Sequence, residues 1–292
     1  MTLFVQFLFR FLSVFPLAWL HALGWLLGWI SFLASGRYRR RLLAHARLAG
    51  IARRDLLASV GEAGKLVTEL PRLWLGRPVV IGWEGAACIE AAQAHGRGML
   101  FLTPHLGCFE IAAQAYAQRF GASHPITVLY RPSRQPWLRE LVAGARQRPG
   151  LRTAPTTLAG VKQMIKALKS GEVVGLLPDQ VPPDGQGVWA PFFGRDAYTM
   201  TLSARLALAA DAQVLLAWGE RLPWGRGYCV HVRRFDEATW GPLSSEAPTA
   251  ARQINQAMES LVRECPRQYL WSYDRYKPPA GHGGRSPAPQ HS

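Results

Sequence analysis

A long uncharged segment near the start of the chain restricts its fold more than any other feature. Between Phe11 and Ser35 there is no Asp, Glu, Lys or Arg, and Leu, Trp and Phe predominate. A helix rises about 1.5 Å per residue, so this segment is long enough to cross the roughly 30 Å hydrocarbon core of a bilayer. It is too long for the apolar part of a signal peptide, and Pro16 would bend the helix near its start rather than end it. The pattern predicts one transmembrane helix that stays attached.

Arginines follow this segment directly and predict its orientation. They are Arg37, Arg39, Arg40, Arg41 and Arg47. Because positive charge accumulates on the cytoplasmic side of membrane helices, we expect everything downstream to lie in the cytoplasm. A helix buried in a core, or one lying in the membrane interface with Trp19, Trp25 and Trp29 as anchors, is the alternative interpretation.

The charge of the chain favours an acidic partner. Lys and Arg number 34 against 19 Asp and Glu, which gives a net charge of +15. Such a charge attracts anionic lipid, nucleic acid or acidic protein. Nucleic acid is not expected, because the sequence contains no zinc-finger spacing and no aromatic RNA-binding motif. The four cysteines are far apart and form no CxxC pair, so neither a metal site nor a disulfide is expected.

Short apolar runs and helical stretches alternate from Val79 onward. The runs include "GMLFLTP", "ITVLYRP", "EVVGLLPD" and "QVLLAWGERL". This alternation is typical of an α/β domain with a largely parallel sheet, in which functional side chains lie where strands end. We expect an anchor over residues 1–36, one α/β domain over 37–278 and a disordered Pro- and Gly-rich tail over 279–292.

The segment "FLTPHLGCFE" holds the main candidates for chemistry. His105 follows an apolar run, and Glu110 comes five positions later, where a helical pattern starts. The two side chains can meet only if His105 lies on the turn, which Gly107 makes sterically easy, and Glu110 lies in the first helical turn. A carboxylate on one ring nitrogen fixes the tautomer and favours the imidazolium that forms when the other nitrogen takes a proton. The pattern therefore predicts a general base.

Other nucleophiles are less favoured by the sequence. Cys108 lies between the two candidates and could in principle form an acyl-enzyme, but a small apolar residue in a first helical turn usually packs. No G-x-S-x-G motif occurs, which argues against a serine hydrolase.

The chain resembles the late-acting lipid A acyltransferases, the lauroyl and myristoyl transferase group within the wider His-x4-Asp/Glu glycerolipid acyltransferases. The segments that carry the resemblance are "HLGCFE", "VLYRP", "MIKALKSGEVVGLLPDQ", "PFFGRDAYTMT" and "PRQYLWSYDRYKPP". The resemblance covers nearly the whole chain, from the anchor to about Pro278. The resemblance implies a glycerolipid acyltransferase-like α/β domain with a mixed, largely parallel sheet flanked by helices.

The resemblance also implies roles for particular residues. His105 would be the base and Glu110 its orienting carboxylate. The substrate-binding candidates are Arg131, Arg148, Asp179, Phe192, Phe193 and Gly194. Asp179 closes an expected strand, Arg148 has the spacing from Asp179 of a family arginine tied to activity, and "PFFGRDAYT" is expected to form a loop. Tyr273 and Asp274 stand where the family often has a histidine or a basic residue.

The implied activity is transfer of an acyl chain from acyl carrier protein to a hydroxyl of a lipid A precursor, at the cytoplasmic face of the bacterial inner membrane, without a metal or organic cofactor. One rival is a glycerophospholipid or ornithine-lipid acyltransferase that uses the same two residues. A rival of another class is a non-catalytic module that binds anionic lipid through its basic surface.

Overall fold

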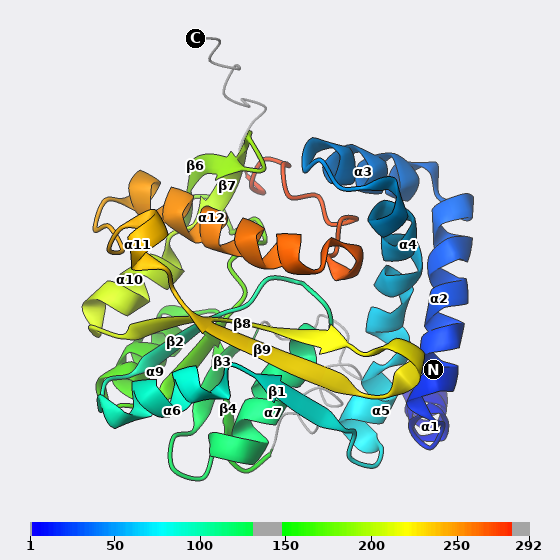
Figure 1. Cartoon of the computed structure of the whole chain (residues 1–292), viewed down its shortest axis with the longest axis horizontal. Helices are drawn as coiled ribbons and strands as arrows, with labels where there is room; N and C mark the ends of the chain where they lie inside the picture. The colour runs from blue at the N-terminus through cyan, green and yellow to red at the C-terminus, as the bar shows by residue number, and fades with distance from the viewer. Residues whose placement is uncertain (1, 131–147, 282–292) are drawn as a thin grey trace.

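A seven-stranded sheet forms the centre of the molecule (Figure 1). The computed structural model describes residues 2–130 and 148–281. The strand order is β1-β9-β8-β2-β5-β3-β4; β8 and β9 pair antiparallel and the other described pairs of this sheet are parallel. The strands are β1 (Ile81–Glu84), β2 (Met99–Leu102), β3 (Ile126–Tyr130), β4 (Leu151–Pro155), β5 (Val173–Leu176), β8 (Gln213–Arg221) and β9 (Tyr228–Arg234). The predicted α/β class with a mixed, largely parallel sheet is confirmed.

Helices cover both faces of this sheet. One face carries α6 (Ala86–Ala94) and α7 (Phe109–Phe120). The other carries α9 (Leu158–Lys169), α10 (Leu202–Ala209) and α12 (Ala247–Glu264). Short elements complete this part: α11 (Glu237–Trp240) and the 3-10 turns η1 (Pro223–Gly225) and η2 (Pro266–Gln268).

Strand β2 illustrates why the central strands are apolar throughout. Successive side chains of a strand point to opposite faces of its sheet. Met99 and Phe101 accordingly pack with α6 and α7, whereas Leu100 and Leu102 pack with α9, α10 and α12. Because both faces are buried, a polar residue fits only where such a strand ends, and that edge holds the residues described below.

The N-terminal segment forms two helices where one was predicted. Helix α1 (Thr2–Ser13) ends before Pro16, and α2 (Leu17–Ala34) begins directly after it. Proline has no N–H to donate and clashes with the preceding turn, so the residue that was expected only to bend the helix interrupts it. Among the described residues, α2 is the one helix long and apolar enough to cross a membrane.

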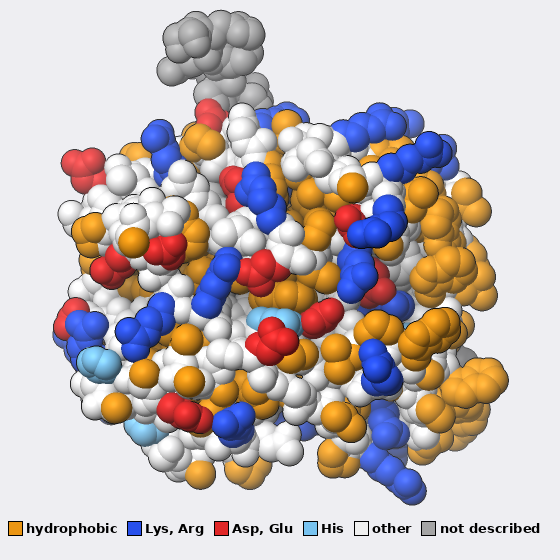
Figure 2. All heavy atoms as spheres, in the orientation of Figure 1, with side chains coloured by type: hydrophobic (Ala, Val, Ile, Leu, Met, Phe, Trp, Pro, Cys, Tyr) orange, Lys and Arg blue, Asp and Glu red, His pale blue; other side chains and the backbone are white. Residues whose placement is uncertain are grey.

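Helices α3 (Gly36–Leu48), α4 (Arg53–Thr68) and α5 (Leu70–Leu75) follow, and α4 lies alongside α2 (Figure 1). Pro71 stands in the first turn of α5, where its missing N–H costs no hydrogen bond. Figure 2 shows hydrophobic side chains gathered along the edge formed by α2, with Lys and Arg side chains over α3 at one end.

The segment around Phe193 is a hairpin rather than the expected loop. Strands β6 (Gly187–Phe192) and β7 (Arg195–Met200) pair antiparallel across a two-residue turn, Phe193 and Gly194. Both turn residues have positive φ, 48° and 76°. Two-residue hairpin turns require this backbone conformation, and glycine at the second position adopts it without strain.

Candidate active site

The site forms where two neighbouring parallel strands end. Strands β2 and β5 pair in parallel, with Leu102 opposite Leu176. His105 comes three residues after β2, and Asp179 three residues after β5. The carboxyl ends of parallel strands meet at one edge of the sheet, so this topology brings together two residues that are 74 positions apart.

Asp179 holds the ring and the backbone of His105 at once. Its Oδ1 lies 2.7 Å from Nδ1 of His105, and its Oδ2 accepts the backbone N–H of His105 at 2.8 Å. The Asp179 side chain is 2% exposed and that of His105 is 14% exposed. Burial alone would raise the pKa of Asp179, but the adjacent His105 ring and its hydrogen bonds hold that pKa below its usual value. Asp179 is therefore a carboxylate, able to fix the imidazole and to stabilise its protonated form.

Gln180 contacts the other ring nitrogen and was not singled out by the sequence. Its side-chain nitrogen lies 2.9 Å from Nε2 of His105. An amide nitrogen can only donate, so Nε2 is the accepting nitrogen in this arrangement, and Nδ1 carries the proton that is donated to Asp179. This is the neutral tautomer that a general base requires.

The C-terminal segment closes over the histidine. The backbone N–H of Leu270 donates to the His105 carbonyl at 3.1 Å, and that of Gly107 donates to the Gln268 carbonyl at 3.0 Å. Tyr269 is buried close to Asp179, and burial together with that negative charge raises the pKa of its hydroxyl well above the usual value. These contacts explain why "PRQYLW" belongs to the site, although the sequence offered no chemical signal for it.

Glu110 lies where the sequence placed it, and Trp74 contacts its carboxylate. It is in the first turn of α7 and is buried. The indole N–H of Trp74, on α5, donates to its Oε1 at 3.3 Å. The carboxylate at Nδ1 of His105, the position expected for Glu110, is Asp179. The short motif did not identify Asp179 as the carboxylate at Nδ1, because the β2–β5 pairing that brings it there is a long-range contact.

Of the two candidate arginines, Arg131 and Arg148, the structure describes only Arg148. Arg131 lies outside the described residues. Arg148 donates to the carbonyl of Leu73 at 2.6 Å, at the C-terminal end of α5. It also lines a cavity of about 550 Å³, whose mostly apolar wall includes Arg72 and Arg77 as well. Arg148 therefore joins α5 to the start of β4 and is one of three arginines in this cavity.

The aromatic turn packs against the C-terminal elements. Phe192 and Phe193 are buried, and the ring of Phe193 lies 5.6 Å from that of Trp271. The backbone N–H of Phe193 donates to Glu259 of α12 at 2.7 Å. Gly194 is in the turn itself. Phe193 thus contacts both α12 and the segment that closes over His105, and the histidine itself is held by Asp179.

Cys108 is placed as a packing residue. It is 1% exposed, and burial, reinforced by the charge of Glu69, raises the pKa of its thiol well above the usual value. A neutral buried thiol is a poor nucleophile. The alternative mechanism through Cys108 gains no support.

A second cluster has ligand types that metals bind. The ligand atoms of Glu84, Cys229 and His231 lie within 4.8 Å of one another, on β1 and β9. His231 is already paired with two carboxylates, Glu84 and Glu220, each at 3.0 Å. Those ion pairs account for the arrangement, and the sequence had not pointed to it.

Comparison with known proteins identifies the family. The family model for bacterial lipid A biosynthesis acyltransferases matches residues 62–278. A lipid A biosynthesis lauroyltransferase of Escherichia coli (strain K12) is 31% identical over 75% of this chain and 69% of that protein. The chain belongs to the bacterial lipid A biosynthesis acyltransferase family. The match contains His105, Glu110, Arg148 and Asp179, so the edge of the sheet described above lies inside the region that the family shares.

Two further relatives within this acyltransferase family are more distant. A lipid A biosynthesis acyltransferase of Haemophilus influenzae (strain ATCC 51907 / DSM 11121 / KW20 / Rd) is 26% identical over 64% of this chain and 56% of that protein. A lipid A biosynthesis palmitoleoyltransferase of Escherichia coli (strain K12) is 26% identical over 66% and 60%. The chain thus spans less than two thirds of these two relatives.

Proposed function

We propose that the chain transfers a fatty acyl group from an acyl carrier protein thioester to a hydroxyl of a lipid A precursor, at the cytoplasmic face of the inner membrane. The observation that carries this proposal is the contact between His105 and Asp179, which leaves Nε2 as the accepting nitrogen, in a chain of this family. One base near neutral pH is what an alcohol needs in order to attack a thioester.

The step itself follows from these atoms. The acceptor hydroxyl takes the place of the Gln180 amide at Nε2 of His105 and gives its proton to that nitrogen as its oxygen bonds to the thioester carbon. The carbon–sulfur bond then breaks, and the leaving thiolate takes the proton from the imidazolium. Asp179 stabilises the charged ring between the two transfers. Every proton and bond is accounted for by the two substrates and His105, so the chemistry needs no cofactor.

Glu110 serves in this proposal as a positioning residue. Its bond to Trp74 ties the first turn of α7 to α5, and α7 starts directly after the loop that holds His105. The ring of Phe109 lies 4.8 Å from the His105 ring and limits its movement on the same side. A displaced α7 would therefore move the base.

Two cavities support the substrate assignments. A narrow apolar cavity lies between α7 and the sheet, and Thr103 and Phe109, which flank His105, line it. An apolar lining suits an acyl chain. The cavity that Arg148 lines with Arg72 and Arg77 suits anionic groups of an acceptor. Arg131, Phe192, Phe193 and Gly194 stay in the proposal as substrate-binding residues on the ground of the family resemblance.

Mass spectrometry of lipid A tests the function. Cells that lack this gene should yield lipid A with one acyl chain fewer, and the wild-type gene should restore it, whereas His105→Ala should not. The mass difference gives the length of the transferred chain. Unchanged lipid A together with altered phospholipid or ornithine lipid would contradict the proposed acceptor. Purified enzyme supplied with acyl carrier protein thioester or with acyl-CoA separates the two donors.

A further inference from the structure

Helix α2 is attached to the catalytic domain along its length. It runs antiparallel to α4, and the two backbones touch: a Cβ added at Gly28 would lie 2.2 Å from the Val60 carbonyl oxygen, and one added at Gly64 would lie 1.9 Å from that of Gly24. Only glycine permits so close an approach. Helix α2 is therefore part of the packed body and does not stand apart as a free anchor.

The beginning of α2 is held by the same domain. Helix α1, which precedes it, packs on α5: the rings of Phe9 and Trp74 are 6.1 Å apart, and Arg72 donates to the Ser13 carbonyl at 3.2 Å. A membrane-crossing α2 with a cytoplasmic catalytic domain would put α1 in the periplasm. Contact with α5 places α1 on the side of the catalytic domain.

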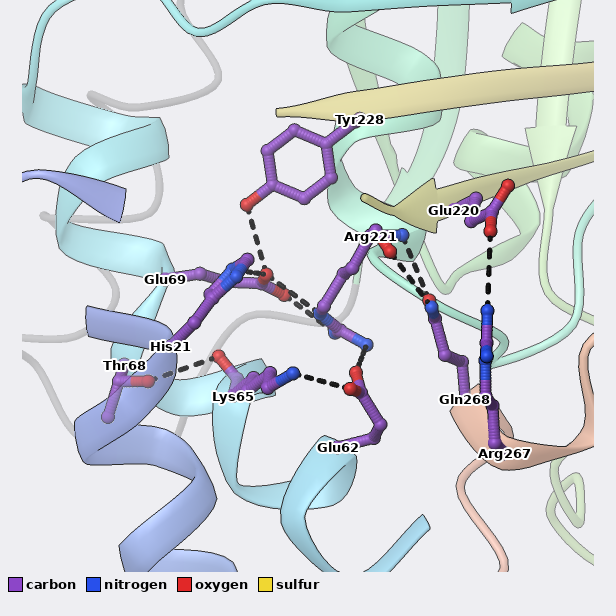
Figure 3. A network of polar contacts seen from close by, with 10 residues as sticks. All are labelled: His21, Glu62, Lys65, Thr68, Glu69, Glu220, Arg221, Tyr228, Arg267 and Gln268. Atoms are coloured by element: carbon purple, nitrogen blue, oxygen red, sulfur yellow. Dashed lines mark hydrogen bonds and ion pairs between the residues drawn. The ribbon is translucent and has the colours of Figure 1, made fainter. Parts of the chain in front are cut away.

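A buried polar network strengthens this end of α2 (Figure 3). His21 lies 3.3 Å from Glu69, and Glu69 accepts two hydrogen bonds from Arg221 of β8, at 2.7 and 2.8 Å. The Tyr228 hydroxyl also donates to Glu69, at 3.0 Å. Gln268 exchanges hydrogen bonds with the backbone of Arg221, and its own carbonyl accepts from the loop of His105. The network thus connects α2 through β8 to the catalytic loop.

The C-terminal end of α2 is also held against the catalytic domain. Helix α3 follows it directly, and its His45 lies 3.0 Å from the Trp271 carbonyl, next to the segment that closes over the active site. Arg41 pairs with Asp274 at 3.0 Å. Both ends of α2 therefore contact the domain that holds the active site. A crossing α2 would also draw charged residues of α4, such as Glu62 and Lys65, toward the hydrocarbon, where a charge is unfavourable.

The outer face of α1 and α2 nevertheless suits lipid. The exposed large apolar side chains of α1, α2 and the turn between them include Phe7, Phe11, Val14, Trp19, Leu26 and Leu33. Trp224, 90% exposed, is on the β8–β9 turn, which packs against the start of α2. Exposed arginines border this face, Arg10 on α1 and Arg37, Arg40 and Arg47 on α3. An apolar face with a basic rim and aromatic residues is the pattern of a segment that lies in a membrane interface rich in anionic lipid.

We propose that α1 and α2 lie in the cytoplasmic leaflet roughly parallel to the membrane surface, so that the chain enters and leaves the bilayer from one side and its N-terminus stays in the cytoplasm. The occupant of the apolar face is the lipid bilayer. This proposal goes beyond the acyl transfer and does not depend on which lipid accepts the chain.

Depth measurements along α2 test the orientation. Trp19, Leu26 and Leu33 are exposed and seven residues apart, so they lie on one side of the helix. Each is replaced singly by Cys and spin-labelled, in a background with Cys88→Ser and Cys229→Ser, and reconstituted in vesicles that contain phosphatidylglycerol. An in-plane helix gives three similar, shallow depths. A crossing helix gives a deep label at 26 and shallow labels at 19 and 33, about 21 Å apart along the axis.

Controls make each outcome decisive. A label at Glu246→Cys, exposed before α12, should be fully accessible to water. In intact spheroplasts, Thr2→Cys and Glu246→Cys should both resist a membrane-impermeant maleimide until lysis. Labelling of position 2 alone before lysis would overturn the proposal in favour of a crossing helix. Water-accessible labels along α2 would overturn the proposal in favour of a helix without lipid contact. Labels shielded from water only when the protein dimerises would overturn it in favour of a second copy of the chain on this face.

Discussion

His105 illustrates how far single residues can be interpreted before a fold is known. Its place on the turn after a strand, with Gly107 beside it and Glu110 in the first helical turn, follows from local periodicity, and the structure has all three. The partner at Nδ1 does not follow, because Asp179 reaches it only through the β2–β5 pairing. Strand order is a long-range property that a short motif does not contain.

The first prediction concerns the pair formed by His105 and Asp179. His105→Ala should lower kcat by about 10²–10⁴, the usual contribution of a general base, with little change in binding. Asp179→Asn should cost a comparable factor, because an amide can donate to Nδ1 and so favours the tautomer with the proton on Nε2. Initial rates on purified, correctly folded variants check this, and the double variant should be barely worse than His105→Ala alone.

Glu110→Gln is the matched comparison. It keeps an oxygen for Trp74 and loses the charge, so as a positioning residue it should cost less in kcat than Asp179→Asn. A loss as large as that of Asp179→Asn, and equally non-additive with His105→Ala, would return the orienting role to Glu110. Turnover within a few-fold of wild type in His105→Ala would reject the proposed base altogether.

The second prediction concerns Glu69 and the dependence of stability on pH. Burial alone would raise its pKa, but Arg221 more than compensates and lowers it from 4.5 to about 2. A carboxylate with a depressed pKa in the folded state stabilises above its unfolded pKa, and this stability is lost as the pH falls toward 2. The thermal midpoint of the wild type should therefore drop on acidification below about pH 4.5.

Glu69→Gln identifies the source of that drop. The variant leaves Arg221 without its buried partner, which should cost roughly 3–5 kcal/mol at neutral pH. Its thermal midpoint should change less with acidification, so the two curves should approach each other at low pH. Parallel curves would mean that other carboxylates cause the acid sensitivity.

At the level of elements, apolar periodicity predicted the layers of the domain well and the N-terminal helices less well. Each sheet strand needs only a short apolar run, and the turns around it are marked by Gly and Pro. The break between α1 and α2 depends on a single proline, Pro16, and the β6–β7 hairpin on a turn with positive φ at Phe193. Composition alone also cannot separate a helix that crosses lipid from one that packs on α4.

The third prediction tests the contact between α2 and α4. Alanine normally stabilises a helix relative to glycine by up to about 1 kcal/mol, but at Gly64 its Cβ would clash with the Gly24 carbonyl. Gly64→Ala should therefore destabilise the protein, by about 1–3 kcal/mol. Gly36→Ala is the control, since its Cβ would meet only side-chain atoms at 3.6 Å or more. Thermal midpoints of the two variants should move in opposite directions or differ by several degrees.

At the scale of the whole molecule, the N-terminal helices and the catalytic domain form one body. Deletion of residues 1–35 would uncover the face of α4 that packs on α2 and remove His21 from Glu69. We therefore expect the shortened protein to aggregate or to unfold at lower temperature rather than to become a soluble, fully active enzyme. Sedimentation and a thermal unfolding curve check this. Full stability and activity after deletion would mean that α2 is only loosely attached.

The last prediction concerns the net charge of +15, which belongs to the molecule as a whole. An acidic donor such as acyl carrier protein should be drawn to this surface, which raises the rate of encounter more than the strength of the final contact. Salt weakens such attraction, and the screening length is about 10 Å at 0.1 M. Initial rates at low donor concentration should therefore fall as ionic strength rises through about 0.1 M, while rates at saturating donor should change little. An acyl thioester of a small neutral thiol provides the control, because it lacks the acidic protein surface. Equal salt profiles for the two donors would show that the positive charge serves the membrane and not the donor.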